Sequence, residues 1–245
     1  MKKFIFILVV LFAATFAFVS CEPNNPEQEP VFEVITKSLT MYVGDIKTLQ
    51  VSSELEYTVK SENEFVATIT EQKNVKGEHV GKTTITITNG KKTEICEIVV
   101  LAKYNPFAEP FIPNYTTNSC EWLTMSNYND SHGFEFLQGN DEYQIYAGKE
   151  SNVYIYYFLD SNLKITEMQI RFYDLDLWQQ LYNYTNERFK LVSSSVLGDD
   201  GNGGYYYEDN FCNALSASKA TLNVTLGNFY TDGTNRLIAL IFTPK

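Results

Sequence analysis

Three consecutive tyrosines, residues 205–207, are the side chains of this chain best suited to holding a ligand. They follow the glycine-rich run 198–204 and precede two acidic residues. Exposed tyrosine rings can stack on sugar rings or anchor a protein partner. A position next to a glycine-rich loop favours the surface, so Tyr205 and Tyr207 are candidate ligand-binding residues.

Tyr154 and Tyr156 form a second candidate pair. Alternate residues of a strand point to the same face, so these two rings would share a face of the apolar run 152–159. The opposite face of that run is apolar as well, with Val153, Ile155, Tyr157 and Leu159. A strand buried on both faces is the favoured interpretation, and an exposed aromatic platform for a glycan or a protein is the alternative.

Groups suited to catalysis are sparse. The chain has two histidines; His79 lies in a glycine-containing loop and is expected to be a solvated turn residue. Ser131-His132 lacks the Gly-x-Ser-x-Gly context of a nucleophilic serine. Glu208 and Asp209 are strand neighbours that would point to opposite faces, whereas a glycosidase needs two acids around one bond. We therefore expect no catalytic residues and no enzymatic activity.

Oxygen ligands gather in one glycine-rich segment, at Asp199, Asp200 and Asn202. Calcium accepts such ligands, but the segment lacks the alternating acids and the distal glutamate of an EF-hand loop. A solvated hairpin turn is the favoured interpretation, and a calcium site is the weaker alternative. The sequence has no Cys-x-x-Cys pair and no His-Glu-x-x-His motif, so no metal or other cofactor is expected.

Cys21 is placed for lipid attachment. Lys2 and Lys3 precede an almost unbroken apolar run, residues 4–19, which has the length of a secretory signal and is short for a membrane span. The small residue Ser20 followed by Cys21 resembles the lipobox of bacterial lipoproteins. The resemblance implies that residues 1–20 are a signal peptide and that the Cys21 thiol carries a diacylglycerol. An uncleaved anchor helix is the alternative.

A tether follows the lipid attachment site. Residues 22–30 hold three prolines, three glutamates and two asparagines. This composition cannot bury a core, so residues 21–30 are predicted to be a lipid anchor and an extended tether. The segment also resembles the acidic tether of surface lipoproteins from Bacteroides-type bacteria. The expected location is the outer membrane or cell surface of a Gram-negative bacterium.

Three cysteines remain after Cys21. Cys96 alternates with Ile98 and Val100 and is expected to be buried and free. Cys120 and Cys212 are then the candidate disulfide of an exported protein.

The composition is that of a globular protein rich in strands. Of the residues, 44% are hydrophobic and 15% are aromatic, which excludes a disordered chain and favours β structure. The formal charge of −11 argues against a protein that binds nucleic acid by neutralising its phosphates.

Residues 31–103 alternate apolar and polar positions between regularly spaced turns, which predicts an all-β sandwich. Asn89-Gly90 predicts a hairpin with a type I′ turn, in which both central residues have positive φ. The segments LTMYVGD (39–45), SENEFVATI (61–69) and GKTTIT (81–86) resemble the group 2 bacterial immunoglobulin-like domain. The resemblance implies a stalk or adhesion module without catalytic residues.

Residues 104–113 contain three prolines and are predicted to be a short linker. Residues 114–245 are predicted to form an α+β domain, with an antiparallel sheet and one main amphipathic helix. Leu177, Leu181, Tyr184 and Arg188 recur at helical spacing, and Asp174 or Asp176 is expected to cap this helix. The strand signals are 134–138, 143–147, 152–159, 163–173, 205–208, 220–229 and 236–243.

Four short matches run through the helix-containing stretch of this second unit: YYF at 156–158, NL at 162–163, IRF at 170–172 and ERF at 187–189. In this order they resemble small α+β lipoprotein domains of Bacteroides-type bacteria. The resemblance carries no known chemistry.

These features predict a cell-envelope lipoprotein with a non-enzymatic binding or adhesion role. The immunoglobulin-like unit would act as a spacer that presents a C-terminal glycan- or protein-binding domain. The expected partners are the membrane, through acyl chains on Cys21, and a glycan or protein ligand, without nucleic acid. A structural or accessory subunit of an outer-membrane complex is the alternative, and a glycan-degrading enzyme is the third possibility.

Overall fold

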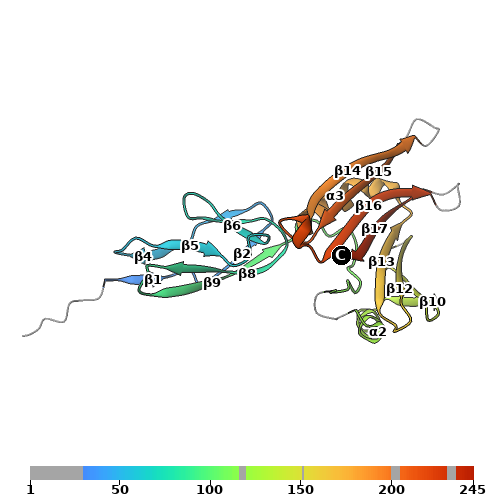
Figure 1. Ribbon diagram of the computed structural model, residues 1–245, viewed down its shortest axis with the longest axis horizontal. Helices are drawn as coiled ribbons and strands as arrows, with labels where there is room; N and C mark the ends of the chain where they lie inside the picture. Colours follow the sequence, from blue (N-terminus) through green and yellow to red (C-terminus); the bar gives the residue numbers. More distant parts are fainter. Residues whose placement is uncertain (1–29, 116–119, 151, 200–204, 231–235) are drawn as a thin grey trace, which may run out of the picture.

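The computed structural model describes residues 30–115, 120–150, 152–199, 205–230 and 236–245, with Asp199, Tyr205 and Tyr230 described by their backbone alone. The predicted signal peptide, Cys21, residues 22–29 of the predicted tether, and Asp200 and Asn202 of the calcium candidate lie outside the described residues. Two separate hydrophobic clusters divide the described chain into an N-terminal unit, residues 30–101, and a C-terminal unit, residues 102–245. Figure 1 shows the two units end to end.

The N-terminal unit is built from strands. They are β1 (Phe32–Val34), β2 (Ser38–Tyr42), β3 (Ile46–Lys47), β4 (Val51–Ser53), β5 (Thr58–Ser61), β6 (Ala67–Ile69), β7 (Val75–Gly77), β8 (Gly81–Thr88) and β9 (Thr93–Leu101). The sheets have the orders β2-β9-β8-β5, β3-β7-β6 and β1-β4. Side chains from all three sheets share one core, which confirms the predicted all-β immunoglobulin-like sandwich.

Strand β9 shows how the alternating pattern builds this core. Cys96, Ile98 and Val100 are buried, as predicted, and Cys96 is a free thiol. The predicted hairpin between β8 and β9 is present, but the predicted turn type is wrong: of the two central residues, Gly90 alone has positive φ, 87°. The Asn89 side-chain oxygen instead accepts hydrogen bonds from the backbone N–H of Lys91 (3.0 Å) and of Lys92 (2.8 Å). This Asx turn closes the loop through side-chain hydrogen bonds, so the backbone does not need a second residue with positive φ.

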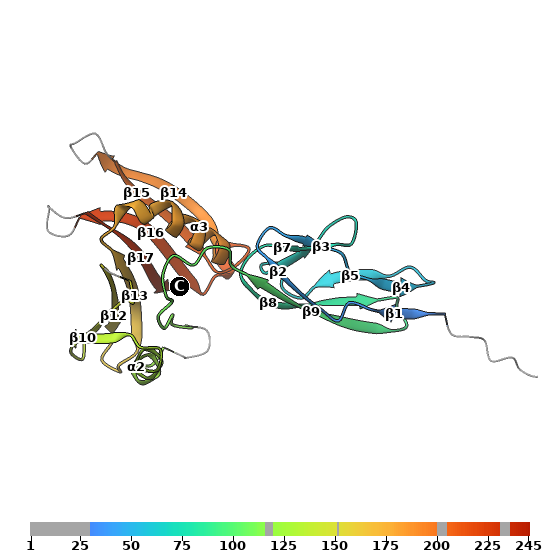
Figure 2. The same ribbon diagram turned by 180° about the vertical axis from the view of Figure 1, so that it is seen from behind.

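The C-terminal unit is one eight-stranded antiparallel sheet with the order β10-β11-β12-β13-β17-β16-β15-β14. Its strands are β10 (Glu135–Gly139), β11 (Tyr143–Ala147), β12 (Val153–Leu159), β13 (Ile165–Phe172), β14 (Lys190–Asp199), β15 (Tyr205–Cys212), β16 (Leu222–Tyr230) and β17 (Arg236–Pro244). The first four strands form the predicted meander. The sheet curves strongly, and its helices lie on the concave side (Figures 1 and 2).

Four helical segments accompany the sheet: α2 (Trp122–Ser131), the 3-10 turns η1 (Leu175–Leu177) and η2 (Ala217–Lys219), and α3 (Trp178–Arg188). The predicted helix is α3, and its Leu181 and Tyr184 are fully buried. The Asp174 carboxylate accepts a hydrogen bond from the Asp176 N–H at 3.0 Å and caps η1, which leads into α3. The sequence analysis misses α2 because that helix buries just two side chains, Met125 and Asn129.

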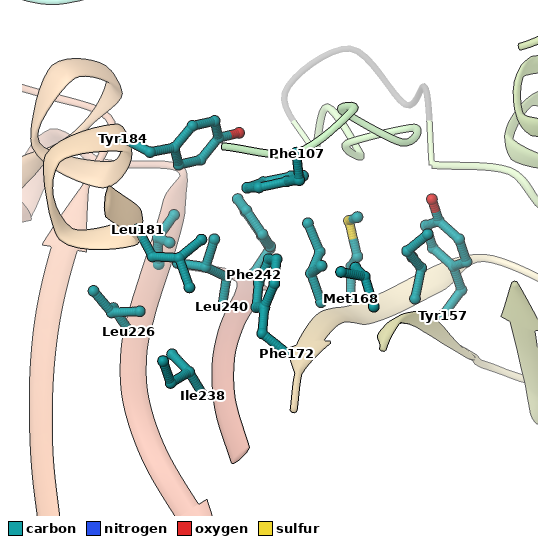
Figure 3. Close-up of a cluster of buried hydrophobic side chains, with 14 of the residues drawn as sticks. Phe107, Tyr157, Met168, Phe172, Leu181, Tyr184, Leu226, Ile238, Leu240 and Phe242 are labelled. Atoms are coloured by element: carbon teal, nitrogen blue, oxygen red, sulfur yellow. The ribbon is translucent and has the colours of Figure 1, made fainter. Parts of the chain in front are cut away.

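The segment predicted to be a linker is part of the C-terminal core. The Phe107 ring is 5% exposed and lies 4.8 Å from Tyr184 and 5.1 Å from Phe172, measured between ring centroids (Figure 3). Further along, the Phe111 N–H donates to the Asn129 side-chain oxygen (3.1 Å), and the Phe111 carbonyl accepts from the Tyr157 hydroxyl (2.8 Å). The linker prediction is therefore wrong, because aromatic side chains between the prolines cover the sheet.

Glu187, near the end of α3, joins the two units. Its carboxylate accepts hydrogen bonds from the backbone N–H of Lys103 (3.1 and 2.9 Å) and of Tyr104 (2.9 Å). Its backbone carbonyl accepts from the N–H of Val80 in the N-terminal unit, at 2.7 Å. The following Arg188 forms an ion pair with Glu109 at 2.7 Å. The end of α3 thus holds the chain on both sides of the junction.

Candidate binding site

A pocket of about 200 Å³ opens on the concave face of the C-terminal sheet. It lies where η1 and the start of α3 approach β15, β16 and β17. Its lining residues are Leu175, Trp178, Tyr207, Asn228, Arg236 and Ile238. Tyr207 is the one sequence-predicted binding residue among them.

The pocket forms where two strands stop pairing. The backbone ladder between β15 and β16 runs from Cys212 to Glu208, which is opposite Gly227. At the next position the Tyr207 N–H donates to the side-chain oxygen of Asn228 at 2.6 Å. A side chain therefore takes the place of a backbone partner at the point where the ladder ends, and it fixes Tyr207 at the rim.

Two aromatic side chains form the walls. Trp178, the first residue of α3, and Tyr207 of β15 have ring centroids 6.3 Å apart and planes inclined at 47°. Tyr207 is 43% exposed, and Trp178 is half-buried. Angled aromatic faces of this kind offer a large apolar contact area at small conformational cost.

Polar groups complete the lining. The Arg236 guanidinium lies 5.9 Å from the centroid of the Tyr206 ring, and Asn228 is held by the hydrogen bond from Tyr207. Guanidinium and amide groups donate to hydroxyl and carboxylate oxygens. The pocket therefore combines apolar walls with a few oriented polar groups, the usual composition of a small-molecule site.

Tyr154 and Tyr156 do not join this pocket. They lie on the convex face, because Val153, Ile155 and Tyr157 point into the core on the other side of β12. The Tyr156 ring lies 3.8 Å from the Arg171 guanidinium, and the Tyr154 ring packs edge-on against Tyr173 at 5.7 Å. Both tyrosines are half-buried, so β12 is packed on one face and partly covered on the other.

Two of the predicted site residues are described by their backbone alone. Tyr205 begins β15 and pairs with Asp199 at the end of β14. Asp199 therefore belongs to a strand, whereas Asp200 and Asn202 lie outside the described residues. Within the described part of the chain, no group of three or more His, Cys, Asp or Glu residues is arranged to hold a metal ion.

Ser131 and His132 form a helix terminus. The Ser131 hydroxyl donates to the Tyr128 carbonyl at 2.9 Å, and His132 Nδ1 lies 2.8 Å from the same carbonyl. A carbonyl can accept but not donate, so Nδ1 carries a proton. The nitrogen that faces Ser131 is therefore not available as its base.

The other titratable candidates are also engaged in structure. His79 is not solvated as predicted: its Nδ1 lies 2.7 Å from the Phe65 carbonyl, and its ring stacks on Phe65 at 4.1 Å. Glu208 accepts from the Asn210 amide at 2.9 Å, whereas Asp209, on the opposite face of β15, is buried.

The predicted disulfide is absent, since Cys120 and Cys212 are both free and buried. The Cys120 carbonyl accepts from the N–H of Ile165, the first residue of β13, whereas Cys212 lies on β15 and pairs with Asn223. Strands β17 and β16 separate β13 from β15. Three strand spacings amount to about 14 Å, which is too far for a disulfide.

Five of the six pocket residues escape the sequence analysis, among them the aromatic and polar residues Trp178, Asn228 and Arg236. Trp178 flanks the helical stripe, and Arg236 opens a strand signal, so each has a local structural explanation. Their sequence separation gives no indication that they meet. A tryptophan at the first position of a helix, outside its apolar stripe, is the one signal that could have raised Trp178 as a candidate.

No helix among the described residues has the length and apolar character needed to cross a membrane. No protein-family model matches the chain, and no curated protein is similar to it.

A comparison with solved structures gives matches of low overall similarity. Domains 5–6 of the S-layer protein SbsC are 14% identical, with 88% of this chain and 97% of that chain covered and a TM-score of 0.27. A longer SbsC structure, residues 31–844, is 15% identical, with 85% and 25% covered and a TM-score of 0.28. Human protocadherin-24 EC1-2 is 13% identical, with 58% and 85% covered and a TM-score of 0.23.

Proposed function

We propose that this chain is a non-enzymatic binding protein of the cell envelope, and that the pocket between Trp178 and Tyr207 binds a glycan. A lipid on Cys21 anchors the chain to the outer membrane. The N-terminal immunoglobulin-like unit acts as a spacer, and the C-terminal unit carries the binding site.

The observation that supports this proposal is the composition of the pocket. A sugar ring has apolar C–H faces and a polar rim of hydroxyl groups. The Trp178 and Tyr207 rings match the faces, and Asn228 and Arg236 match the rim. Arg236 further favours a sugar that carries a carboxylate, because a guanidinium binds a carboxylate through two parallel hydrogen bonds.

The junction at Glu187 supports the spacer role. Hydrogen bonds from Val80, Lys103 and Tyr104 all end on this one residue. A C-terminal unit held in this way keeps a fixed direction relative to its stalk, which suits a protein that presents a site away from a membrane.

A glycan array followed by calorimetry tests the binding role. Tyr207→Ala and Trp178→Ala are expected to weaken binding of the best glycan at least about tenfold, as for central aromatic anchors. Tyr154→Ala is the matched control, because it also removes a tyrosine ring, but from the convex face and away from the pocket. Since Tyr207 is 43% exposed, its variant should keep the melting temperature. Equal loss of binding in the Tyr154 variant would contradict the assignment of the pocket.

Lipid attachment is tested separately. Cys21→Ser should abolish incorporation of labelled palmitate and should move the protein from the membrane fraction to the soluble fraction. Labelling that persists in this variant would show that the lipid is attached elsewhere.

A second candidate function, that of an accessory subunit in a larger assembly, is favoured by a different observation. Val192, Val196 and Leu197 of β14 are large apolar side chains, and each is at least 50% exposed. Such a group on a surface strand is typical of a protein interface.

A further inference from the structure

The lining of the pocket between Trp178 and Tyr207 continues onto the neighbouring strand. Strand β14 pairs with β15, and Val196 lies directly opposite Tyr207 in that pairing. Directly opposed residues of an antiparallel pair point to the same face of the sheet, with Cβ atoms about 5 Å apart. Val196 therefore lies on the concave face beside the pocket, where its side chain is exposed.

The same level of the sheet extends across β16 and β17. The Tyr207 N–H donates to the Asn228 side chain, and Asn228 lies opposite Ile238 of β17. We call Val196, Tyr207, Asn228 and Ile238 the concave row. The row crosses four strands, and three strand spacings amount to about 14 Å, which is longer than a single sugar ring.

Exposure along the concave row rises in one direction. Ile238 is 1% exposed, Tyr207 43% and Val196 61%, whereas Asn228 is half-buried. At the Ile238 end the row meets Phe172 of β13, which is fully buried, and η1 packs against β17. At the Val196 end the sheet stops, because among the described residues β14 pairs with β15 alone. The row is thus closed at one end and open at the other.

The helical cover borders the concave row on its inner side. The next level of the sheet toward the core holds Asp209 on β15 and Leu226 on β16, and both are buried. In Figures 1 and 2 β14 forms the outer rim of this half of the sheet, and α3 lies inside the curve. A ligand in the pocket can therefore extend along the row, over Val196, but not toward the core.

We propose that this site takes the non-reducing end of an oligosaccharide chain, with the end sugar in the pocket and the next sugar over Val196. This inference rests on the proposed glycan-binding function. Glycans on surfaces are attached through their reducing ends, so the non-reducing end is the one free to enter a row that is closed at its far end. The Val196 side chain offers an apolar surface to the C–H face of the second sugar.

An extended peptide is a poorer occupant of this site. Peptides that add to a sheet pair along an edge strand through backbone hydrogen bonds. The pairing of β14 shifts register at Val192 and at Leu197, and bulges of this kind protect an edge from such pairing. The concave row instead runs across the strands and offers side chains, which suits a chain that binds through ring faces and hydroxyl groups.

A glycan array tests which part of the chain is bound. On an array whose glycans are attached through their reducing ends, the bound glycans should share their terminal sugar and differ in their inner units. Glycans that carry the same sugar at an inner position alone should not bind. Bound glycans that share an inner unit would overturn the end-on assignment and leave the proposed glycan-binding function intact, whereas absence of binding to every glycan would contradict both.

Calorimetry tests the contact with Val196. The trisaccharide that ends in the bound sugar should bind at least about fivefold more tightly than the methyl glycoside of that sugar, because it also covers this side chain. Val196→Ser removes the apolar surface without adding a charge, so it should abolish the difference and keep the affinity for the methyl glycoside. Val192→Ser is the matched control, because it changes another exposed valine of β14 away from the row, and it should keep the difference. Equal affinities of the wild-type protein for the two ligands, or an equal loss in the two variants, would refute the proposal.

Discussion

The two units of this molecule close their cores in different ways. In the N-terminal unit the buried side chains come from strands of facing sheets and the loops between them, and one face of β8 and of β9 supplies much of the core. Among the described residues of the C-terminal unit, the single sheet has no second sheet packed against it. Helix α3, helix α2 and the chain around Phe107 cover it instead (Figure 3).

This difference decides where a binding site can form. In a sandwich two sheets pack face to face, so side chains fill the space between them. A curved sheet covered by separate segments is open wherever the cover stops. The cover stops between η1 and the end of the β15–β16 ladder, and the pocket of Trp178 and Tyr207 lies there. The covering segments, rather than the sheet, therefore set the position of the site.

The largest loss of stability is expected from truncating Phe107, which covers the C-terminal sheet. Phe107→Ala should lower the free energy of unfolding of the C-terminal unit by about 3–5 kcal/mol, the cost of truncating a buried aromatic residue. Hydrogen exchange resolved by segment should show lost protection in β13 and β17 and unchanged protection in β8 and β9. Phe136→Ala is the control, because Phe136 is 49% exposed. Loss of protection in both units alike would show that they share one cooperative core.

A smaller loss of stability is expected from a substitution of Glu187 at the junction. Glu187→Ala removes the acceptor for the N–H groups of Lys103 and Tyr104. Hydrogen bonds to a charged group contribute about 1.5–3 kcal/mol, so the calorimetric transition of the C-terminal unit should move to a lower temperature. Glu187→Gln keeps one acceptor oxygen and should lie between Ala and wild type. An unchanged transition temperature in Glu187→Ala would mean that these side-chain hydrogen bonds do not stabilise the C-terminal unit.

The parts of the fold that the sequence predicted are those with a local signal. Cys96, Ile98 and Val100 alternate along one strand, and Leu181 and Tyr184 are spaced as on a helix. Each pattern lies within a few residues, and each residue is buried as expected. The hydrophobic pattern alone is enough for such elements because it is set by the geometry of the backbone.

The parts that it did not predict depend on contacts between distant segments. The serines 193–195 interrupt the apolar pattern of β14, so the strand gives no alternating signal. Phe107 resembles a linker residue until Tyr184 and Phe172 are placed around it. Likewise, the Cys120–Cys212 prediction failed because the order of the strands, which separates the two thiols, is not visible in the spacing of cysteines.

The smallest expected effect is a pH dependence of the free energy of unfolding, caused by His79 in the N-terminal unit. His79 is half-buried between Phe65 and the junction, and burial lowers the pKa of its imidazole below the ordinary value of 6.5. The nearby Lys190 also lowers this pKa, whereas the hydrogen bond to the Phe65 carbonyl and the carboxylate of Glu78 raise it. Because the net shift is downward, the folded state prefers the neutral ring.

The sign of the pH effect follows from this preference. Below pH 6.5 the unfolded chain binds a proton at His79 before the folded chain does, so the free energy of unfolding falls as the pH decreases. The loss stops once the pH is below the folded pKa. Urea unfolding monitored between about pH 7.5 and 5 should show this slope, and His79→Gln, which cannot titrate, should lack it. A slope that is the same in both proteins would assign the pH dependence to other groups. The junction would then not respond to the protonation of His79. Its stability would depend on Glu187 and on the backbone N–H groups that donate hydrogen bonds to it.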